Sequence, residues 1–271
     1  MSRIRDTFAK LKHTGRGGFI PFITAGDPDL ETTELLLIEL AAAGADIIEL
    51  GVPFSDPVAD GEVIQRASER ALQNGVTLSD ALRCISNVKA HIDVPIVLFS
   101  YLNPLLKFGK DRLAKEAKGA GVDAVLITDL IPEEAAPWII TFRDHGISLI
   151  FLVAPTTSDE RLAHIAKQAD GFIYAVSRAG VTGARNEMPG DAEALVERVR
   201  AVSDLPIAVG FGISTAQQVR EVWRFADAAV IGSAIVSEIE KLADSPELVN
   251  RIGEFARSFL KSKRIGQTTE S

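Results

Sequence analysis

The chain has 271 residues, 46% of them hydrophobic and 24% charged, enough to bury a sizeable core in one large or two small domains. Its net charge of −8 argues against a general affinity for nucleic acid or anionic membranes. The one cysteine, Cys84, excludes a disulfide framework and a cysteine metal cluster, as suits a reducing compartment.

The first residues predict a short amphipathic helix that ends near Gly15, and they lack the apolar stretch of a secretory signal. No run of the sequence reaches the roughly 18 apolar residues that a membrane span needs. We therefore expect a cytoplasmic protein without a membrane anchor.

Eight short apolar segments then follow one another and predict buried strands. They begin at Phe19, Asp46, Pro95, Asp123, Ser148, Gly171, Pro206 and Asp227. Most lack strict alternation of apolar and polar residues, which is typical of parallel strands covered on both faces. Helical spacing between them predicts helices over 30–43, 112–118, 132–145, 159–168, 191–202 and 215–225.

This alternation of strands and helices predicts an α/β fold, a (β/α)8 TIM barrel that spans residues 1–271 as a single domain. An open doubly wound sheet is the alternative, but no dinucleotide-binding motif follows the first strand. The widest spacings follow the second and sixth strands. Long loops there would cover the C-terminal mouth, where barrel active sites lie.

Two carboxylates bracket the segment ELGVPFSDPVADG at residues 49–61. Glu49 ends an apolar run, where a carboxylate is costly unless it has a partner or a task. Asp60 lies at the far end of the loop, nearer water. Two carboxyls in such different environments can hold different protonation states at one pH, as general acid–base chemistry requires. Taken alone, Asp60 is better explained as the N-cap of a helix that starts near Glu62, and beside Glu49 the two explanations are about equal.

Glycines mark the ends of the last two predicted strands, at Gly210 and Gly212 and again at Gly232 before Ser233. Barrels often bind phosphate between these two loops and a short extra helix, which we expect over residues 233–238. Plain tight turns are the alternative. The segment SRAGVTGAR at 177–185 predicts a mobile lid in which Gly183 brings another amide to the phosphate, with an ordinary surface loop as the alternative.

Residue types absent from the strand ends narrow the chemistry. No predicted strand ends in lysine, which argues against an imine-forming aldolase. The histidines lie away from the mouth, so we expect no metal site. Apolar residues near the strand ends predict a flat substrate pocket lined by Phe22, Phe99, Tyr101, Leu126, Tyr174 and Phe211.

Five segments resemble the tryptophan synthase alpha chain family, and the resemblance runs from about residue 4 to residue 260. They are PFITAGDP (21–28), residues 49–61, SRAGVTGAR (177–185), GFGIS (210–214) and GSAIV (232–236). The resemblance implies retro-aldol cleavage of indole-3-glycerol phosphate to indole and glyceraldehyde 3-phosphate in tryptophan biosynthesis. It implies that Glu49 is the general acid–base and that Asp60 accepts the indole N–H. Further matching positions are the phosphate contacts Gly183, Gly212, Gly232 and Ser233, the pocket residues Phe22, Tyr101 and Tyr174, and the lid residue Thr182.

The resemblance also implies a pyridoxal-phosphate beta chain in an α2β2 complex, with contacts near Asp56 and Asn103, and no cofactor in this chain itself. Ile131 and Glu62 stand where the family usually has proline, and Ala179 stands where a hydroxyl residue is common. We expect Ile131 and Ala179 to affect coupling to the beta chain. Two other hypotheses are an activating subunit with little activity of its own and a different phosphate-sugar enzyme, such as an isomerase.

Overall fold

The strands form a closed parallel barrel in which each strand pairs with the next and β8 returns to β1. The computed structural model describes residues 2–176, 189–210 and 212–260. Each predicted apolar segment contains one strand, which confirms the barrel and shows that the open sheet is wrong. The strands are β1 (Gly18–Thr24), β2 (Ile48–Gly51), β3 (Ile96–Ser100), β4 (Ala124–Ile127), β5 (Ser148–Val153), β6 (Ile173–Val176), β7 (Ile207–Gly210) and β8 (Ala228–Ile231).

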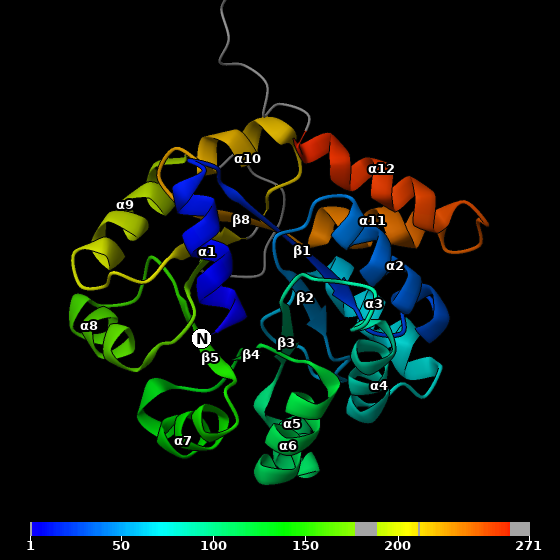
Figure 1. Cartoon of the computed structure of the whole chain (residues 1–271), viewed down its shortest axis with the longest axis horizontal. Helices are drawn as coiled ribbons and strands as arrows, with labels where there is room; N and C mark the ends of the chain where they lie inside the picture. Colours follow the sequence, from blue (N-terminus) through cyan, green and yellow to red (C-terminus); the bar gives the residue numbers. More distant parts are fainter. Residues whose placement is uncertain (1, 177–188, 211, 261–271) are drawn as a thin grey trace, which may run out of the picture.

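Helices pack on the barrel, and all of them except α1 form an outer ring around it (Figure 1). They are α1 (Arg3–His13), α2 (Leu30–Ala42), α3 (Glu62–Gln73), α4 (Leu78–Val88), α5 (Leu102–Phe108), α6 (Lys110–Ala120), α7 (Ala136–Asp144), α8 (Asp159–Gln168), α9 (Pro189–Arg200), α10 (Ala216–Val222), α11 (Ser233–Leu242) and α12 (Leu248–Leu260). The predicted helix at 132–145 is divided into the 3-10 turn η1 (Pro132–Glu134) and α7, because Pro137 favours a new helix start. Within the described ranges, no helix is long and apolar enough to cross a membrane.

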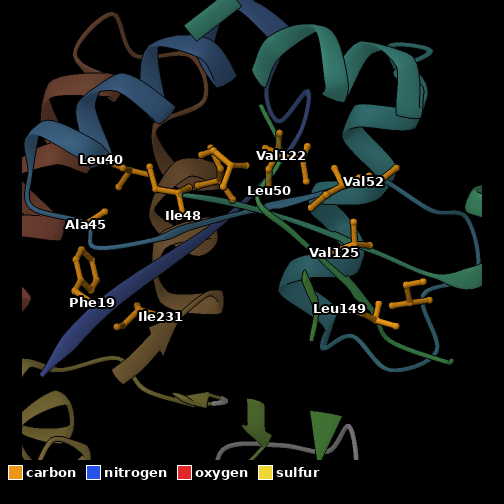
Figure 2. Close-up of a cluster of buried hydrophobic side chains, with 14 of the residues drawn as sticks. Phe19, Leu40, Ala45, Ile48, Leu50, Val52, Val122, Val125, Leu149 and Ile231 are labelled. Atoms are coloured by element: carbon orange, nitrogen blue, oxygen red, sulfur yellow. The ribbon is translucent and has the colours of Figure 1, made fainter. Parts of the chain in front are cut away.

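Side chains of each strand alternate between the barrel interior and the layer beneath the helices. In β2, Ile48 and Leu50 belong to the outer layer, where they are buried with Leu40 of α2 (Figure 2). Ile47, just before β2, belongs to the interior cluster instead. Glu49 is two residues further along the chain, so its side chain projects into the barrel near the C-terminal end of the strand.

Helix α1 closes the N-terminal end of the barrel. Its residues Ile4, Phe8 and Leu11 join the interior cluster, and the Phe8 ring lies 5.6 Å from that of Phe172 (centroid to centroid). In Figure 1 the helix lies inside the outer ring. Arginines around it pair with aspartates that precede the strands, as in the 3.0 Å Arg3–Asp123 contact. Side chains of α1 thereby pack the barrel interior at its N-terminal end, and Glu49 lies toward the opposite end.

Two of the helices that depart from the simple strand–helix repeat, α3 and α11, lie next to β1. After β2 the chain forms α3 and then α4; it is α4 that packs between α2 and α6, whereas α3 packs against α11 and β1. After β8 the chain forms α11, which is longer than the predicted 233–238, and then α12, which packs on α2. The pair α3 and α11 therefore flanks the strand that carries Phe22.

We predict that Phe8→Ala lowers the free energy of unfolding by about 3–5 kcal/mol, because it leaves a cavity between α1 and Phe172. Urea unfolding followed by circular dichroism measures the change. Lys10→Ala, at an exposed position of the same helix, is the control and should change stability by less than about 0.5 kcal/mol. Equal stability of the two variants would contradict a structural role for α1.

Candidate active site

Glu49 lies on β2, which pairs with a neighbouring strand on each side. Its backbone is in register with Phe22 of β1 and Val97 of β3. The residue is only 1% exposed, and neither carboxyl oxygen has a hydrogen-bond partner within the part of the chain that the structure describes. An ionised carboxylate in such a place would lose its hydration without compensation. Glu49 is therefore held as a neutral acid.

Burial raises the pKa of Glu49 from 4.5 to about 8. Removal of the carboxyl from water accounts for this shift. At neutral pH the group carries its proton in a site where nothing described competes for it. That is the state of a general acid ready to donate.

Asp60 occupies the loop between β2 and α3 and is half-buried. The N-cap of α3 is Gly61, so the helix-cap explanation of Asp60 is wrong. Burial raises its pKa from 3.8 to about 6, although a hydrogen bond from the Tyr101 hydroxyl opposes the rise. The same hydroxyl accepts a 3.0 Å hydrogen bond from the backbone N–H of Ala59. Tyr101, at the start of α5, thus holds this loop over the mouth.

Four of the predicted pocket residues lie on strands of the barrel: Phe22 on β1, Phe99 on β3, Leu126 on β4 and Tyr174 on β6. Phe22 and Phe99 meet edge to face with ring centroids 5.3 Å apart. Burial raises the pKa of Tyr174, and the charges of Glu49 and Asp60 add to the rise. Leu126 is fully buried in the interior cluster that contains Tyr174.

Glycines leave room for two of these aromatic rings. A Cβ on Gly210 would lie 2.2 Å from the Tyr174 hydroxyl oxygen, and one on Gly51 would lie 2.6 Å from the Phe22 ring. Alanine at either position would displace a pocket side chain. Gly210 therefore serves the pocket by packing, a role that its motif did not reveal.

Three of the predicted phosphate-binding residues follow the paired strands β7 and β8. Gly232 is the N-cap residue of α11 and lies beside Phe22, and the exposed Ser233 begins the helix. Gly212 has φ +77°, a conformation that other residues rarely adopt. Because the first amides of a helix carry the positive end of its dipole, this corner suits an anion. The predicted site residues Thr182, Gly183 and Phe211 and the variant position Ala179 lie outside the described residues.

Three residues at the mouth were not predicted from sequence. Thr24, at the end of β1, is 2% exposed, and its hydroxyl has no partner among the described residues. Asp27, in the next loop, is 2% exposed and pairs with Arg70 of α3. The motif PFITAGDP contains both Thr24 and Asp27, so a polar residue directly after a buried strand was an available signal.

Two further observations in the described part of the chain concern metal binding and the cysteine thiol. Among the described residues, no group of three or more His, Cys, Asp or Glu is arranged to hold a metal ion. Burial raises the pKa of the Cys84 thiol to about 12, which makes it a poor nucleophile.

We predict that Glu49→Gln changes the pH dependence of stability. The folded chain binds more protons at Glu49 than the unfolded chain between pH 4.5 and about 8, so wild-type stability falls as pH rises through that range. The stability of the variant relative to wild type should therefore increase by on the order of 3 kcal/mol from pH 5 to pH 8. Urea unfolding at both pH values tests this, with the exposed Glu69→Gln as control. A constant difference would show that Glu49 ionises freely.

We also predict that Tyr101→Phe raises the pKa of Asp60 above about 6, because the variant removes the hydroxyl that donates to the carboxylate. Carbon-13 NMR titration of the Asp60 carboxyl measures it. Tyr174→Phe is the matched control and should leave this pKa unchanged. An unchanged or lower value in Tyr101→Phe would refute the role of the Tyr101 hydroxyl.

Comparison with known proteins extends over nearly the whole chain. A family model described as tryptophan synthase alpha chain matches residues 8–263. The tryptophan synthase alpha chain of Citrifermentans bemidjiense is 51% identical over 255 residues, which cover 94% of this chain and 95% of that protein. The one from Roseiflexus sp. is 49% identical over 259 residues, covering 95% and 99%.

Solved structures of similar proteins superpose on nearly the whole chain. Tryptophan synthase subunit alpha from Legionella pneumophila superposes with a TM-score of 0.90 at 38% identity, covering 96% of this chain and 98% of that one. A chain of M. tuberculosis tryptophan synthase in its aminoacrylate-bound form gives a TM-score of 0.85 at 35% identity, covering 96% and 100%. With this agreement in sequence and in barrel structure, the chain belongs to the tryptophan synthase alpha chain family and is an enzyme of tryptophan biosynthesis.

Proposed function

We propose that the chain is a carbon–carbon lyase that cleaves indole-3-glycerol phosphate to indole and glyceraldehyde 3-phosphate. The observation that carries the proposal is the pair of carboxyls at the mouth. With pKa values of about 8 for Glu49 and about 6 for Asp60, the first is mostly protonated and the second mostly ionised at pH 7. An acid and an anion thus coexist at one end of the barrel.

Glu49 is the proposed acid–base. Indole becomes a leaving group only when the ring carbon that bears the glycerol chain gains a proton, and the neutral Glu49 carboxyl supplies it. The resulting carboxylate accepts the proton of the adjacent glycerol hydroxyl as the carbon–carbon bond breaks. The bond electrons return to the indole ring and the hydroxyl carbon becomes the aldehyde. Glu49 ends the cycle protonated, so no other reactant is needed.

Asp60 is proposed to stabilise the charge that this protonation creates. Protonation of the ring carbon makes the indole nitrogen more positive, and a carboxylate that accepts its N–H lowers the energy of that state. Tyr101 supports the role because it holds the loop through Ala59 and keeps the pKa of Asp60 lower than burial alone would set it. The aromatic residues Phe22, Phe99 and Tyr174 provide an apolar surface for the ring.

The phosphate is proposed to bind at the start of α11. Gly232 and Ser233 begin this helix, and we propose Gly212, in the loop after β7, and Gly183 as further contacts. Thr182 is proposed to meet Asp60 when substrate is bound, and Phe211 and Leu126 to complete the pocket. The net charge of −8 gives no general attraction for phosphate, so local amides and the helix dipole would provide the binding.

The partner is proposed to be a beta chain that carries pyridoxal phosphate, in an α2β2 complex. The segments that follow the neighbouring strands β2, β3 and β4 each expose an apolar side chain: Val58 is 76% exposed, Leu106 of α5 57% and Ile131 43%. Asp56 and Asn103 are exposed beside them. Exposed apolar side chains on adjacent segments favour a protein partner. Ile131 is proposed to tune that contact, as is Ala179.

We further propose that the chain acts as a single barrel domain over residues 1–271, without a cofactor of its own, in the cytoplasm. The family assignment supports each of these statements. The beta chain would then supply the cofactor chemistry that consumes indole.

We predict that Glu49→Gln lowers indole release by about 10²–10⁴-fold, because an amide cannot donate the proton. Asp60→Asn should also lower kcat, since a neutral amide stabilises positive charge less well. Purified protein is mixed with indole-3-glycerol phosphate, with and without a beta chain, and indole is measured. Glu133→Gln, on the exposed side of η1, is the control.

Two outcomes would count against the proposal. Normal turnover by Glu49→Gln would remove Glu49 from the mechanism. No indole from wild type, even with a beta chain present, would leave a phosphate-binding barrel without this activity.

A further inference from the structure

Helices α3 and α11 each begin at one part of the proposed substrate site. Helix α3 starts at Glu62, directly after the loop that carries Asp60, and α11 starts at Ser233, where the phosphate is proposed to bind. Strands β2 and β8 both pair with β1, so the two helices flank the same strand. The relative placement of α3 and α11 therefore determines how far Asp60 lies from the phosphate contacts.

An apolar cluster forms the first part of the contact between these helices. Ala67 of α3, Val236 of α11 and Phe22 of β1 are buried together, with Val63 packed against them. These contacts bring the helices together, but small apolar side chains allow sliding. Directional contacts are needed to fix one helix along the other.

A group of four charged side chains supplies the directional contacts. Arg70 of α3 donates two hydrogen bonds to Asp27, at 2.8 and 2.9 Å, and one of 2.7 Å to Glu240 of α11. Arg66, one turn earlier, donates two more to Glu240, at 2.7 and 2.8 Å. Two arginines thus balance two carboxylates. Of the two, Arg70 is the one that reaches both α11 and the loop after β1.

The surroundings of Arg70 make its geometry rigid. The Asp27 side chain is 1% exposed and the Arg70 side chain 27% exposed, whereas the Arg66 side chain is 47% exposed. A planar guanidinium can bind one carboxylate with two donors and a second carboxylate with another, which a lysine ammonium cannot match. Removing Arg70 would also leave the buried Asp27 carboxylate without this partner.

We propose that Arg70 is a positioning residue for the proposed cleavage: it sets the spacing between Asp60 and the phosphate-binding start of α11. The inference rests on the proposed function, because the spacing matters only to a ligand that spans both places. Inorganic phosphate needs only the α11 end. Indole-3-glycerol phosphate needs both ends at once, so loss of Arg70 should affect the two ligands differently.

The test compares Arg70→Met with Arg66→Met in the full chain. For Arg70→Met we expect kcat/KM for indole-3-glycerol phosphate to fall about 10–100-fold, with a higher KM and a lower kcat, because small misplacements cost this much. Its inhibition constant for inorganic phosphate should stay within about twofold of wild type. Arg66→Met removes a charge from the same face but leaves Asp27 paired, and it should change kcat/KM less than about threefold.

Three results would overturn the proposal. One is equal kinetics of the two variants. Another is an equal loss of phosphate binding and of kcat/KM in Arg70→Met, which would indicate general damage to the site. If Arg70→Met does not fold, Arg70→Lys is measured in its place. Wild-type kinetics of Arg70→Lys would be the third result that overturns the proposal. If the wild type itself releases no indole, with or without a beta chain, that result refutes the proposed function, which the three results above do not test.

Discussion

The burial of one carboxyl group, without a hydrogen-bond partner among the residues that the structure describes, is the constraint on which the site depends. Glu49 lies in register with Phe22 and Val97 inside the barrel, where water and counter-charges are excluded. That environment raises its pKa and keeps the proton on the group at neutral pH. The fold bears a stability cost for this, because an apolar residue of similar size would pack there without desolvating a polar group.

The rest of the mouth can be understood as a frame around that acid. Tyr101 holds the loop of Asp60, and Gly51 and Gly210 leave room for the Phe22 and Tyr174 rings. At the other end of the barrel, α1 fills the interior and pairs with residues that precede the strands. The N-terminal end of the barrel is therefore packed by α1, and the C-terminal end carries the candidate catalytic residues.

Sequence alone predicted the strands well, because each is a continuous apolar segment and the barrel covers both faces of its sheet. It also placed Glu49 and Asp60 in one functional segment. Helices were predicted less completely: α8 has the expected bounds, whereas α7 begins later and α11 extends further. Their ends depend on caps and packing partners that a local pattern does not contain.

What the sequence by itself determined was therefore the order of strands and helices and the types of residue available at the mouth. Only the tertiary structure decided that Glu49 is buried with no hydrogen-bond partner in the described part of the chain, that Gly61 and not Asp60 caps α3, and that Arg70 joins Asp27 to Glu240. Each of these facts concerns residues distant in sequence or the exclusion of water. Closure of the barrel creates them, since contact and burial follow from how the strands and helices pack and not from any one segment.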